Sequence, residues 1–263
     1  MDGAAQTTID LAATIFRTRI DRYCSDLVPG LHLVGSAADG DFRPGQSDLD
    51  FVAVLSRIPT DADIEALGVL HRSYGSDPTL PRLDGIWLTR EELRAGPDAV
   101  GPGPTSASGT FFESARGNRN PVTWISLQHG IPIIGTLDPG TLWCDRERLR
   151  AWVRQNATGY WRPWLNRSSG WGPAGLAMLG RAAPMWGVLG IARQHYTVTT
   201  GEIASKSAAG QWALERFGEH HRRILAEALA SRHGAPSAYR NPFNRRRDAL
   251  TFIATALAAI DAA

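Results

Sequence analysis

The sequence predicts an α/β domain followed by an all-helical domain. Two short apolar runs, at 31–34 and 51–55, indicate buried strands, and the second run is rich in β-branched and aromatic residues. From residue 145 onward the apolar positions recur at helical spacing instead. We therefore expect an α/β domain over residues 1–140 and a bundle of helices over residues 141–263.

Helices and strands should alternate along the first domain. The spacing of apolar residues predicts a helix over 8–27, a second helix over 61–70 and a strand over 81–89. The segment 97–109 is so rich in Gly, Pro and Ser that it is expected to be a loop. A second apolar block, at 124–135, then closes the domain.

The second domain should consist of four helices. They are predicted over 145–161, 176–196, 207–232 and 247–259. Pro184 lies inside the second of these ranges. A proline within a helix removes a backbone hydrogen bond, so a kink is expected there.

Composition narrows the classes of protein to consider. The net charge is +2 and the basic residues are scattered, apart from two short arginine runs, so we expect no nucleic-acid partner. No apolar stretch approaches the ~18 residues that cross a membrane, so we expect a cytoplasmic protein without a membrane partner. Cys24 and Cys144 show neither zinc-site nor disulfide spacing, and both are expected to be buried thiols. The oligomeric state stays unknown at this level.

A glycine, a serine and two aspartates form the motif that carries chemistry. Gly35 and Ser36 follow the first apolar run, and a glycine lets the backbone approach a phosphate whose oxygens the serine hydroxyl and amides can bind. Asp48 and Asp50 lie two residues apart at the start of the second run, so in a strand both side chains face the same side. Such a carboxylate pair suits Mg²⁺, although solvated turn acids can show the same spacing.

A third acid, Asp84, lies in the next predicted strand. Phosphoryl transfer commonly uses two Mg²⁺ ions that bridge the attacking and leaving oxygens, and carboxylates must hold them. Asp84 can complete the metal site of Asp48 and Asp50 or accept the proton of an acceptor hydroxyl. The alternative interpretation is an ordinary acid at a turn or strand edge.

The segment that contains these residues, LVGSAADGDFRPGQSDLDFVAVL, resembles the signature of the nucleotidyltransferase superfamily: Gly-Ser after a hydrophobic residue, a spacer, then Asp-x-Asp among apolar residues. The resemblance implies an N-terminal catalytic domain with a mixed sheet flanked by helices. It also implies bound Mg²⁺ and the transfer of a nucleoside monophosphate, with release of pyrophosphate.

A second segment, LGIARQHYTVTTGEIASKSAAGQWALERF, resembles the helical C-terminal domain of the streptomycin and spectinomycin adenylyltransferases. In that family an arginine and a lysine of this domain reach the triphosphate of ATP across the interdomain cleft, and Arg193 and Lys206 occupy the matching positions. Lys206 is the only lysine in the sequence. Without the resemblance, Arg193 would be interpreted as a surface ion-pair partner and Lys206 as a solvated or capping residue.

Two departures from the family leave the acceptor open. The third acid of the family is usually a Glu that activates the drug hydroxyl, and Asp84 is shorter. The acidic segment that holds the cationic drug corresponds here to 183–186, which contains no carboxylate. The sequence thus predicts transfer of AMP from ATP to a hydroxyl of an aminoglycoside-like or other small molecule. The alternatives are a protein or RNA acceptor, as in toxin–antitoxin pairs, and a catalytically silent nucleotide-binding module.

Overall fold

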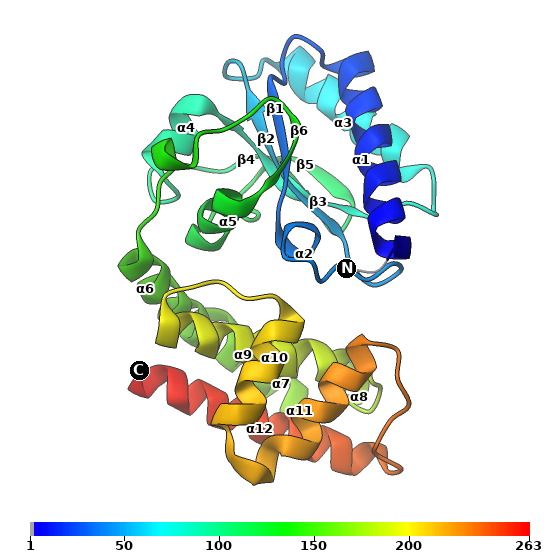
Figure 1. Ribbon diagram of the computed structural model, residues 1–263, viewed down its shortest axis with the longest axis vertical. Coiled ribbons are helices and arrows are strands. Elements are labelled where there is room, and N and C mark those ends of the chain that lie inside the picture. The colour runs from blue at the N-terminus through cyan, green and yellow to red at the C-terminus, as the bar shows by residue number, and fades with distance from the viewer. Residues whose placement is uncertain (1–2) are drawn as a thin grey trace. The chain divides into compact units, whose positions relative to one another are not determined.

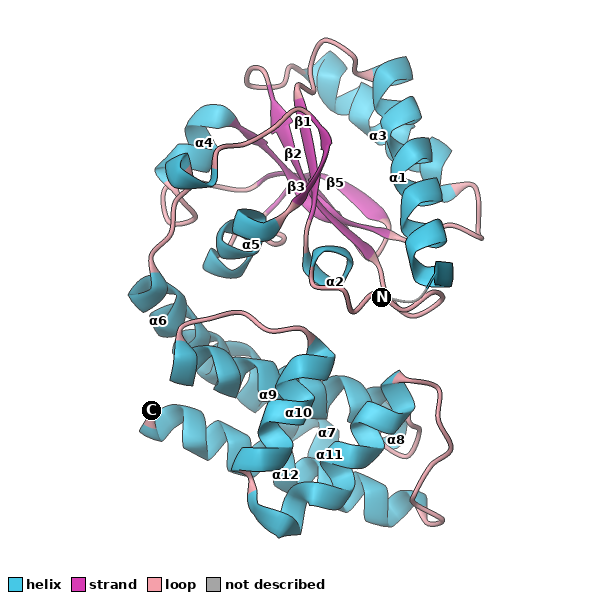
Figure 2. Ribbon diagram, viewed as in Figure 1, coloured by secondary structure: helices cyan, strands magenta, loops and turns pink. Residues whose placement is uncertain are grey.

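A six-stranded mixed sheet forms the centre of the N-terminal part of the chain, and the C-terminal part contains only helices (Figures 1 and 2). The computed structural model describes residues 3–263. The chain divides into two units, Met1–Cys144 and Asp145–Ala263. The predicted fold class, an α/β domain followed by a helical domain, is confirmed. None of the helices described is both long and apolar enough to cross a membrane.

The strands lie in the order β5-β4-β3-β2-β1-β6. Only β2 and β3 pair in parallel, and the other four pairs are antiparallel. The parallel pair is joined through helix α3, as a parallel connection requires. The strands span the following residues: β1 Gly30–Leu33, β2 Leu49–Leu55, β3 Leu83–Thr89, β4 Gly103–Ala107, β5 Thr110–Ala115 and β6 Ile131–Ile134.

Helices cover both faces of this sheet (Figure 1). Helices α1 and α3 pack on the face to which Phe51 and Trp87 point. Helices α4 and α5 pack on the other face, where Val52 and Ile86 lie, because successive side chains of a strand alternate between faces. The helices are α1 Gly3–Tyr23, α2 Gly35–Ala38, α3 Asp61–Gly75, α4 Arg90–Ala95 and α5 Pro121–Ser126, with 3₁₀ turns at Leu127–His129 and Pro139–Thr141.

The segment 97–109 is not the loop that its composition predicts, because it contains strand β4. The hydroxyl of Ser106 is buried and donates to the Leu83 carbonyl oxygen at 2.8 Å. The guanidinium of Arg119, also buried, donates to the carbonyl oxygens of Trp87 and Pro104, each at 2.9 Å. These tertiary hydrogen bonds hold a segment of small and polar residues in the sheet despite its low strand propensity.

The second unit is built around helix α9, which packs against α6, α10, α11 and α12. A π-helical turn, Ala157–Trp161, links α6 to α7 without a break in the chain direction. The helices are α6 Arg146–Asn156, α7 Arg162–Ser169, α8 Pro173–Ala177, α9 Ala182–Thr200, α10 Lys206–Arg216, α11 Gly218–Arg232 and α12 Pro242–Ala262.

Two helix predictions are wrong in detail. Pro184 lies in the first turn of α9, where its missing N–H is not needed, so it begins a helix and does not kink one. The range 207–232 holds two helices, α10 and α11, which separate at Phe217 and Gly218. Gly218 has a positive φ of 24°, which favours glycine and interrupts the helical path.

The two cysteines differ in environment. Cys24 is buried, as expected, and burial raises the pKa of its thiol to about 11. Cys144 is exposed, so the prediction of a second buried thiol is wrong. It lies in a chain segment outside the strands and helices, where no apolar layer covers it.

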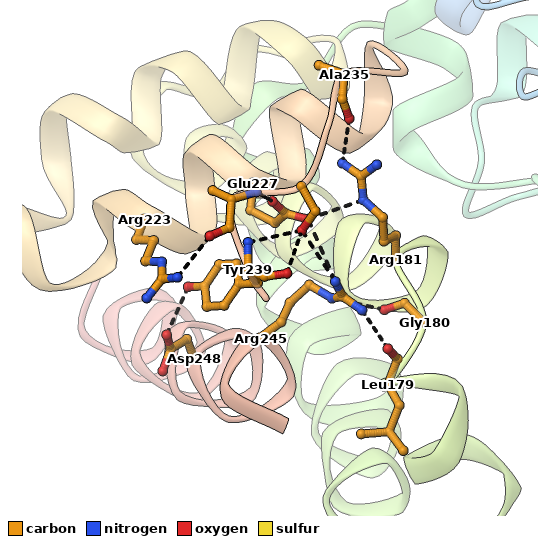
Figure 3. A network of polar contacts seen from close by, with 11 residues as sticks. Leu179, Gly180, Arg181, Arg223, Glu227, Ala235, Tyr239, Arg245 and Asp248 are labelled. Atoms are coloured by element: carbon orange, nitrogen blue, oxygen red, sulfur yellow. Dashed lines mark hydrogen bonds and ion pairs between the residues drawn. The ribbon is translucent and has the colours of Figure 1, made fainter. Parts of the chain in front are cut away.

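A buried carboxylate organises one side of the second unit (Figure 3). Glu227 of α11 is 2% exposed, and its Oε1 lies 3.2 Å from Arg181 Nε and 3.9 Å from Arg245 Nη1. The same carboxylate accepts hydrogen bonds from the Ser237 hydroxyl at 2.7 Å and from the Ala238 N–H at 2.8 Å. It therefore joins the start of α9, the start of α12 and the connection between α11 and α12.

Arg245 is the second centre of this network. Its side chain is 8% exposed, and it donates to the carbonyl oxygens of Leu179 at 2.5 Å and Gly180 at 3.2 Å. Nearby, the Tyr239 hydroxyl donates to Asp248 at 2.8 Å, and the Arg223 guanidinium lies 4.0 Å from the Tyr239 ring centre. The Arg245 side chain thus satisfies two carbonyl oxygens of the connection between α8 and α9.

A buried histidine lies in the first unit between α3 and the sheet. His71 is 4% exposed and packs among the rings of Phe16, Phe51, Trp87 and Phe111. Burial among apolar rings disfavours the charged imidazolium and lowers the pKa of His71 to about 4. The side chain is therefore neutral at pH 7.

We predict that Glu227→Ala destabilises the fold by about 3–5 kcal/mol, because Arg245 would keep a buried charge without its carboxylate partner. Urea unfolding followed by circular dichroism measures the change. Glu219→Ala is the matched control, since its ion pair with Arg222 is largely exposed and should contribute less than about 1 kcal/mol. Equal effects of the two substitutions would contradict this account.

The His71 pKa predicts a pH dependence of stability. The unfolded chain binds a proton at His71 below about pH 6.5 and the folded chain does so only below about pH 4, so stability falls as the pH falls through this window. By pH 5 the loss from His71 should be about 2 kcal/mol. Comparing unfolding free energies at pH 8 and pH 5 for the wild type and His71→Phe tests this, and the variant should lose less stability. An identical pH dependence would contradict the prediction.

Candidate active site

The Gly35-Ser36 turn lies directly over an acidic strand end. Strand β1 ends at Leu33, the Val34 N–H donates to the Asp50 carbonyl oxygen at 3.0 Å, and helix α2 begins at Gly35. Gly35 has a φ of +59°, and a Cβ at this position would overlap the Asp50 carboxylate. Only glycine therefore allows both the backbone conformation and the close approach of the turn to Asp50.

Ser36 presents a hydroxyl that the fold itself does not use. Its Oγ is buried and has no hydrogen-bond partner among the residues described. A buried hydroxyl without a partner is uncommon in a folded protein and is costly. An oxygen-rich group such as a phosphate would supply the missing partner, so this turn fits the phosphate role that its sequence predicts.

Asp50 and Asp84 are brought side by side by the parallel strands. They are register partners at the N-terminal ends of β2 and β3, and both point to the face that α4 and α5 cover. In the next register position Gly85 faces Phe51, and a Cβ on Gly85 would overlap the Phe51 carbonyl oxygen. The glycine thus permits the close strand contact that places the two carboxylates together.

Both oxygens of Asp84 accept hydrogen bonds. Asn118 Nδ2 donates to Oδ1 at 2.8 Å, and the Ser108 N–H at the β4–β5 turn donates to Oδ2 at 3.4 Å. Burial raises the pKa of Asp84, with a smaller contribution from the Asp48 charge, while the two donors act in the opposite direction. Asn118 is a site residue that sequence reasoning missed, because its position depends on the β4–β5 hairpin.

Asp48 lies just before β2 and is turned toward a different partner. Its Oδ1 is 3.3 Å from Arg82 Nε, and the two side chains are 32% and 68% exposed. An ion pair this exposed is worth little and exchanges easily. Within residues 3–263 no three His, Cys, Asp or Glu side chains form a ready metal-binding group. The structure thus brings Asp50 and Asp84 together and keeps Asp48 paired with Arg82.

Arg193 and Lys206 are the two predicted phosphate contacts of the second unit. Arg193 contacts the connection between α9 and α10, and Lys206 lies at its end. Arg193 on α9 donates from Nε to the Ala204 carbonyl oxygen at 3.0 Å and so fixes the connection to α10. Ser205 caps α10 by accepting from the Ala208 N–H at 3.1 Å, and Lys206 is the first helical residue. The positive end of the helix dipole lies at this point, which favours anions nearby.

The range 183–186, which the resemblance relates to a drug-binding acidic segment, ends in an aromatic cluster. The ring of Trp186 stacks on Trp161 at a centroid distance of 5.0 Å and an interplanar angle of 25°. Trp164 lies 5.4 Å from the Trp186 centroid, and Tyr160, which is 44% exposed, lies 6.3 Å from it. The range 183–186 thus contains one aromatic ring, that of Trp186, and no carboxylate.

Comparison with known proteins relates both units to one group of proteins. Residues 174–258 match the family model for the C-terminal domain of aminoglycoside adenylyltransferases. No curated protein sequence matches the chain. The structure is similar to the crystal structure of spectinomycin adenyltransferase AAD(9) from Enterococcus faecialis with ATP and spectinomycin, with a TM-score of 0.67 and 17% sequence identity over 96% of this chain and 99% of that chain.

These matches agree with the expectations drawn from the two motif segments. The family match includes the α9–α10 segment on which the second resemblance rested, and extends beyond it on both sides. The likeness in fold covers both units. The resemblance to the aminoglycoside adenylyltransferases is therefore confirmed in sequence for residues 174–258, and the whole chain is similar in fold to the solved spectinomycin adenyltransferase.

Proposed function

We propose that this protein is a Mg²⁺-dependent nucleotidyltransferase that transfers AMP from ATP to a hydroxyl group of a small molecule and releases pyrophosphate. The observation that carries the proposal is the close approach of the Gly35-Ser36 turn to the Asp50 and Asp84 pair. A phosphate-binding turn and two neighbouring carboxylates are the parts that nucleotidyl transfer needs.

The residues at this site suit magnesium. Hard cations such as Mg²⁺ prefer carboxylate oxygens, and Asp50 and Asp84 supply them from adjacent strands. Asp48 would join them by leaving its exposed ion pair with Arg82. When bound, Mg²⁺ would neutralise the triphosphate charge and polarise the phosphorus that is attacked.

The resemblance to the adenylyltransferases and the chemistry of the side chains support the remaining proposed roles. Ser36 and the amides of its turn would hold phosphate oxygens, and Arg193 and Lys206 would add positive charge to the triphosphate. Asp84 would take the proton of the acceptor hydroxyl as its oxygen attacks the α-phosphorus. The bond from the α-phosphorus to the bridging oxygen then breaks, and pyrophosphate leaves. Positioning and charge neutralisation provide most of the rate gain.

An aminoglycoside or a related hydroxylated compound is the leading class of acceptor. The solved relative contains spectinomycin beside ATP, and the C-terminal region matches the aminoglycoside adenylyltransferase family. The aromatic cluster around Trp186 can stack on the apolar face of a sugar or cyclitol ring. Since it offers no carboxylate, recognition through ring stacking is expected to replace part of the charge recognition.

A pyrophosphate-release assay with each Mg–nucleoside triphosphate and a panel of spectinomycin, streptomycin, other aminoglycosides and hydroxylated metabolites tests donor and acceptor together. We expect ATP to support turnover with at least one acceptor. Asp50→Asn should lower turnover by roughly 100-fold or more, because it removes a metal-binding charge while keeping the side-chain shape.

Asp21→Asn is the control for this substitution, since Asp21 is an exposed residue of α1. Its turnover should equal that of the wild type. Normal turnover of Asp50→Asn would overturn the assignment of the site. Binding of MgATP in calorimetry without turnover on any acceptor would instead indicate a silent nucleotide-binding module.

Substitution of Lys206 tests the contribution of the second unit. Lys206→Ala should lower kcat/KM for ATP by about 10- to 100-fold, the effect of losing one charged hydrogen bond. Lys206→Arg should retain part of the activity, because the charge remains while its shape changes. Arg247→Ala, an exposed cation on α12, is the matched control and should leave kcat/KM unchanged. A Lys206→Ala enzyme with wild-type kcat/KM would contradict the phosphate role.

A further inference from the structure

A pocket of about 780 Å³ lies in the first unit between helix α3 and the edge strand β5. We call it the α3–β5 pocket. Its volume is within the range of small-molecule sites in proteins. The pocket follows the face of α3 that runs from Asp61 to Ser76, and its other wall includes Gly109 and Phe111. Gly68 also lines it, and a Cβ added there would lie 3.3 Å from Arg72 Nη1 and 3.7 Å from Phe111 Cδ1, so a larger side chain would crowd the pocket wall.

The α3–β5 pocket lies on the opposite side of the sheet from the candidate active site. Phe111 stacks on His71, which belongs to the layer of α1 and α3. Asp50 and Asp84 point instead toward the layer of α4 and α5. A ligand in this pocket would therefore not occupy the place of ATP or of the acceptor.

The charge of the α3–β5 pocket is negative although the protein as a whole is basic. Asp61 and Glu65 on α3 and Glu113 on β5 line it, against one cation, Arg72. All four side chains are exposed, and no residue of the described chain makes a hydrogen bond or ion pair with any of them. Three carboxylates against one guanidinium leave an excess of two negative charges, which favours a ligand that carries more than one positive charge.

The floor of the α3–β5 pocket offers a further polar group. His71 lines the pocket and is 4% exposed, and its Nε2 has no hydrogen-bond partner among the described residues. An unpartnered buried nitrogen costs about 1–3 kcal/mol, and an N–H donor that reached it would remove this cost. The ring of Phe111, another residue that lines the pocket, stacks on the imidazole at a centroid distance of 4.8 Å.

The α3–β5 pocket also has an apolar surface, which further narrows the class of ligand that it fits. Ile64 of α3 and Phe111 of β5 line the pocket together with the acids, so its surface is both acidic and apolar. An aliphatic polyamine combines the matching groups, because methylene chains separate its ammonium groups. We propose that the α3–β5 pocket binds a linear aliphatic polyamine, with ammonium groups at Asp61, Glu65 and Glu113 and methylene groups on Ile64 and Phe111.

Isothermal titration calorimetry of spermidine into the full chain at low ionic strength tests the proposal. We expect saturable binding at one site with a Kd below about 1 mM. Glu65→Gln combined with Glu113→Gln should weaken binding at least about tenfold, because two of the three carboxylates lose their charge. Gly68→Leu should abolish binding by filling the pocket without changing its charge.

Glu215→Gln is the matched control, because Glu215 is an exposed, unpaired carboxylate of α10 outside the pocket. It should bind spermidine as the wild type does. The proposal is overturned if wild type shows no binding, if Gly68→Leu binds normally, or if the control weakens binding as much as the double substitution. Binding of a lysine-rich peptide in place of spermidine would also overturn it and would indicate a protein partner. None of these measurements depends on nucleotidyl transfer.

Discussion

The arrangement of the first unit depends on one steric constraint, the close approach of Gly35 to the Asp50 carboxylate. Because the Gly35 turn rests on the Asp50 carboxylate, β1 must end beside the start of β2, and α2 must begin there. The Val34 N–H bond to the Asp50 carbonyl oxygen fixes the same contact through the backbone. Parallel pairing with β3 then adds Asp84. One steric requirement thus gathers the Gly35-Ser36 turn and two acids.

The sequence indicated strand β2 and its acids because their signals are local. β-Branched and aromatic residues mark β2, and the Asp48-x-Asp50 spacing indicated a carboxylate pair. In the structure only Asp50 lies in the strand, while Asp48 precedes it and pairs with Arg82. Strand β4 could not be predicted in the same way. Its residues Gly103–Ala107 have low strand propensity, and the buried guanidinium of Arg119 holds them in the sheet. Asn118 was missed for the related reason that its contact with Asp84 depends on this hairpin.

In the second unit the sequence correctly indicated an all-helical structure, but it predicted four helices where the structure has seven, α6 to α12, and it did not predict where they end. Pro184 was expected to bend a helix, but it lies in the first turn of α9, which begins at Ala182. The break between α10 and α11 has no proline to mark it, and Gly218 supplies the unusual backbone angle. The buried network of Glu227, Arg181 and Arg245 also escaped prediction, because charged residues are ordinarily exposed. Helix ends in this unit are set by tertiary contacts that local patterns do not reveal.

The single lysine of this chain has a practical consequence. Lysine and arginine both carry positive charge, but only lysine has a primary amine that acylating reagents modify readily. Lys206 is the only such side chain, so apart from the α-amino group of the chain a reagent of this kind attaches a spectroscopic label at the start of α10 alone, without any engineered residue. Under the proposed function, added nucleotide would protect that amine from labelling.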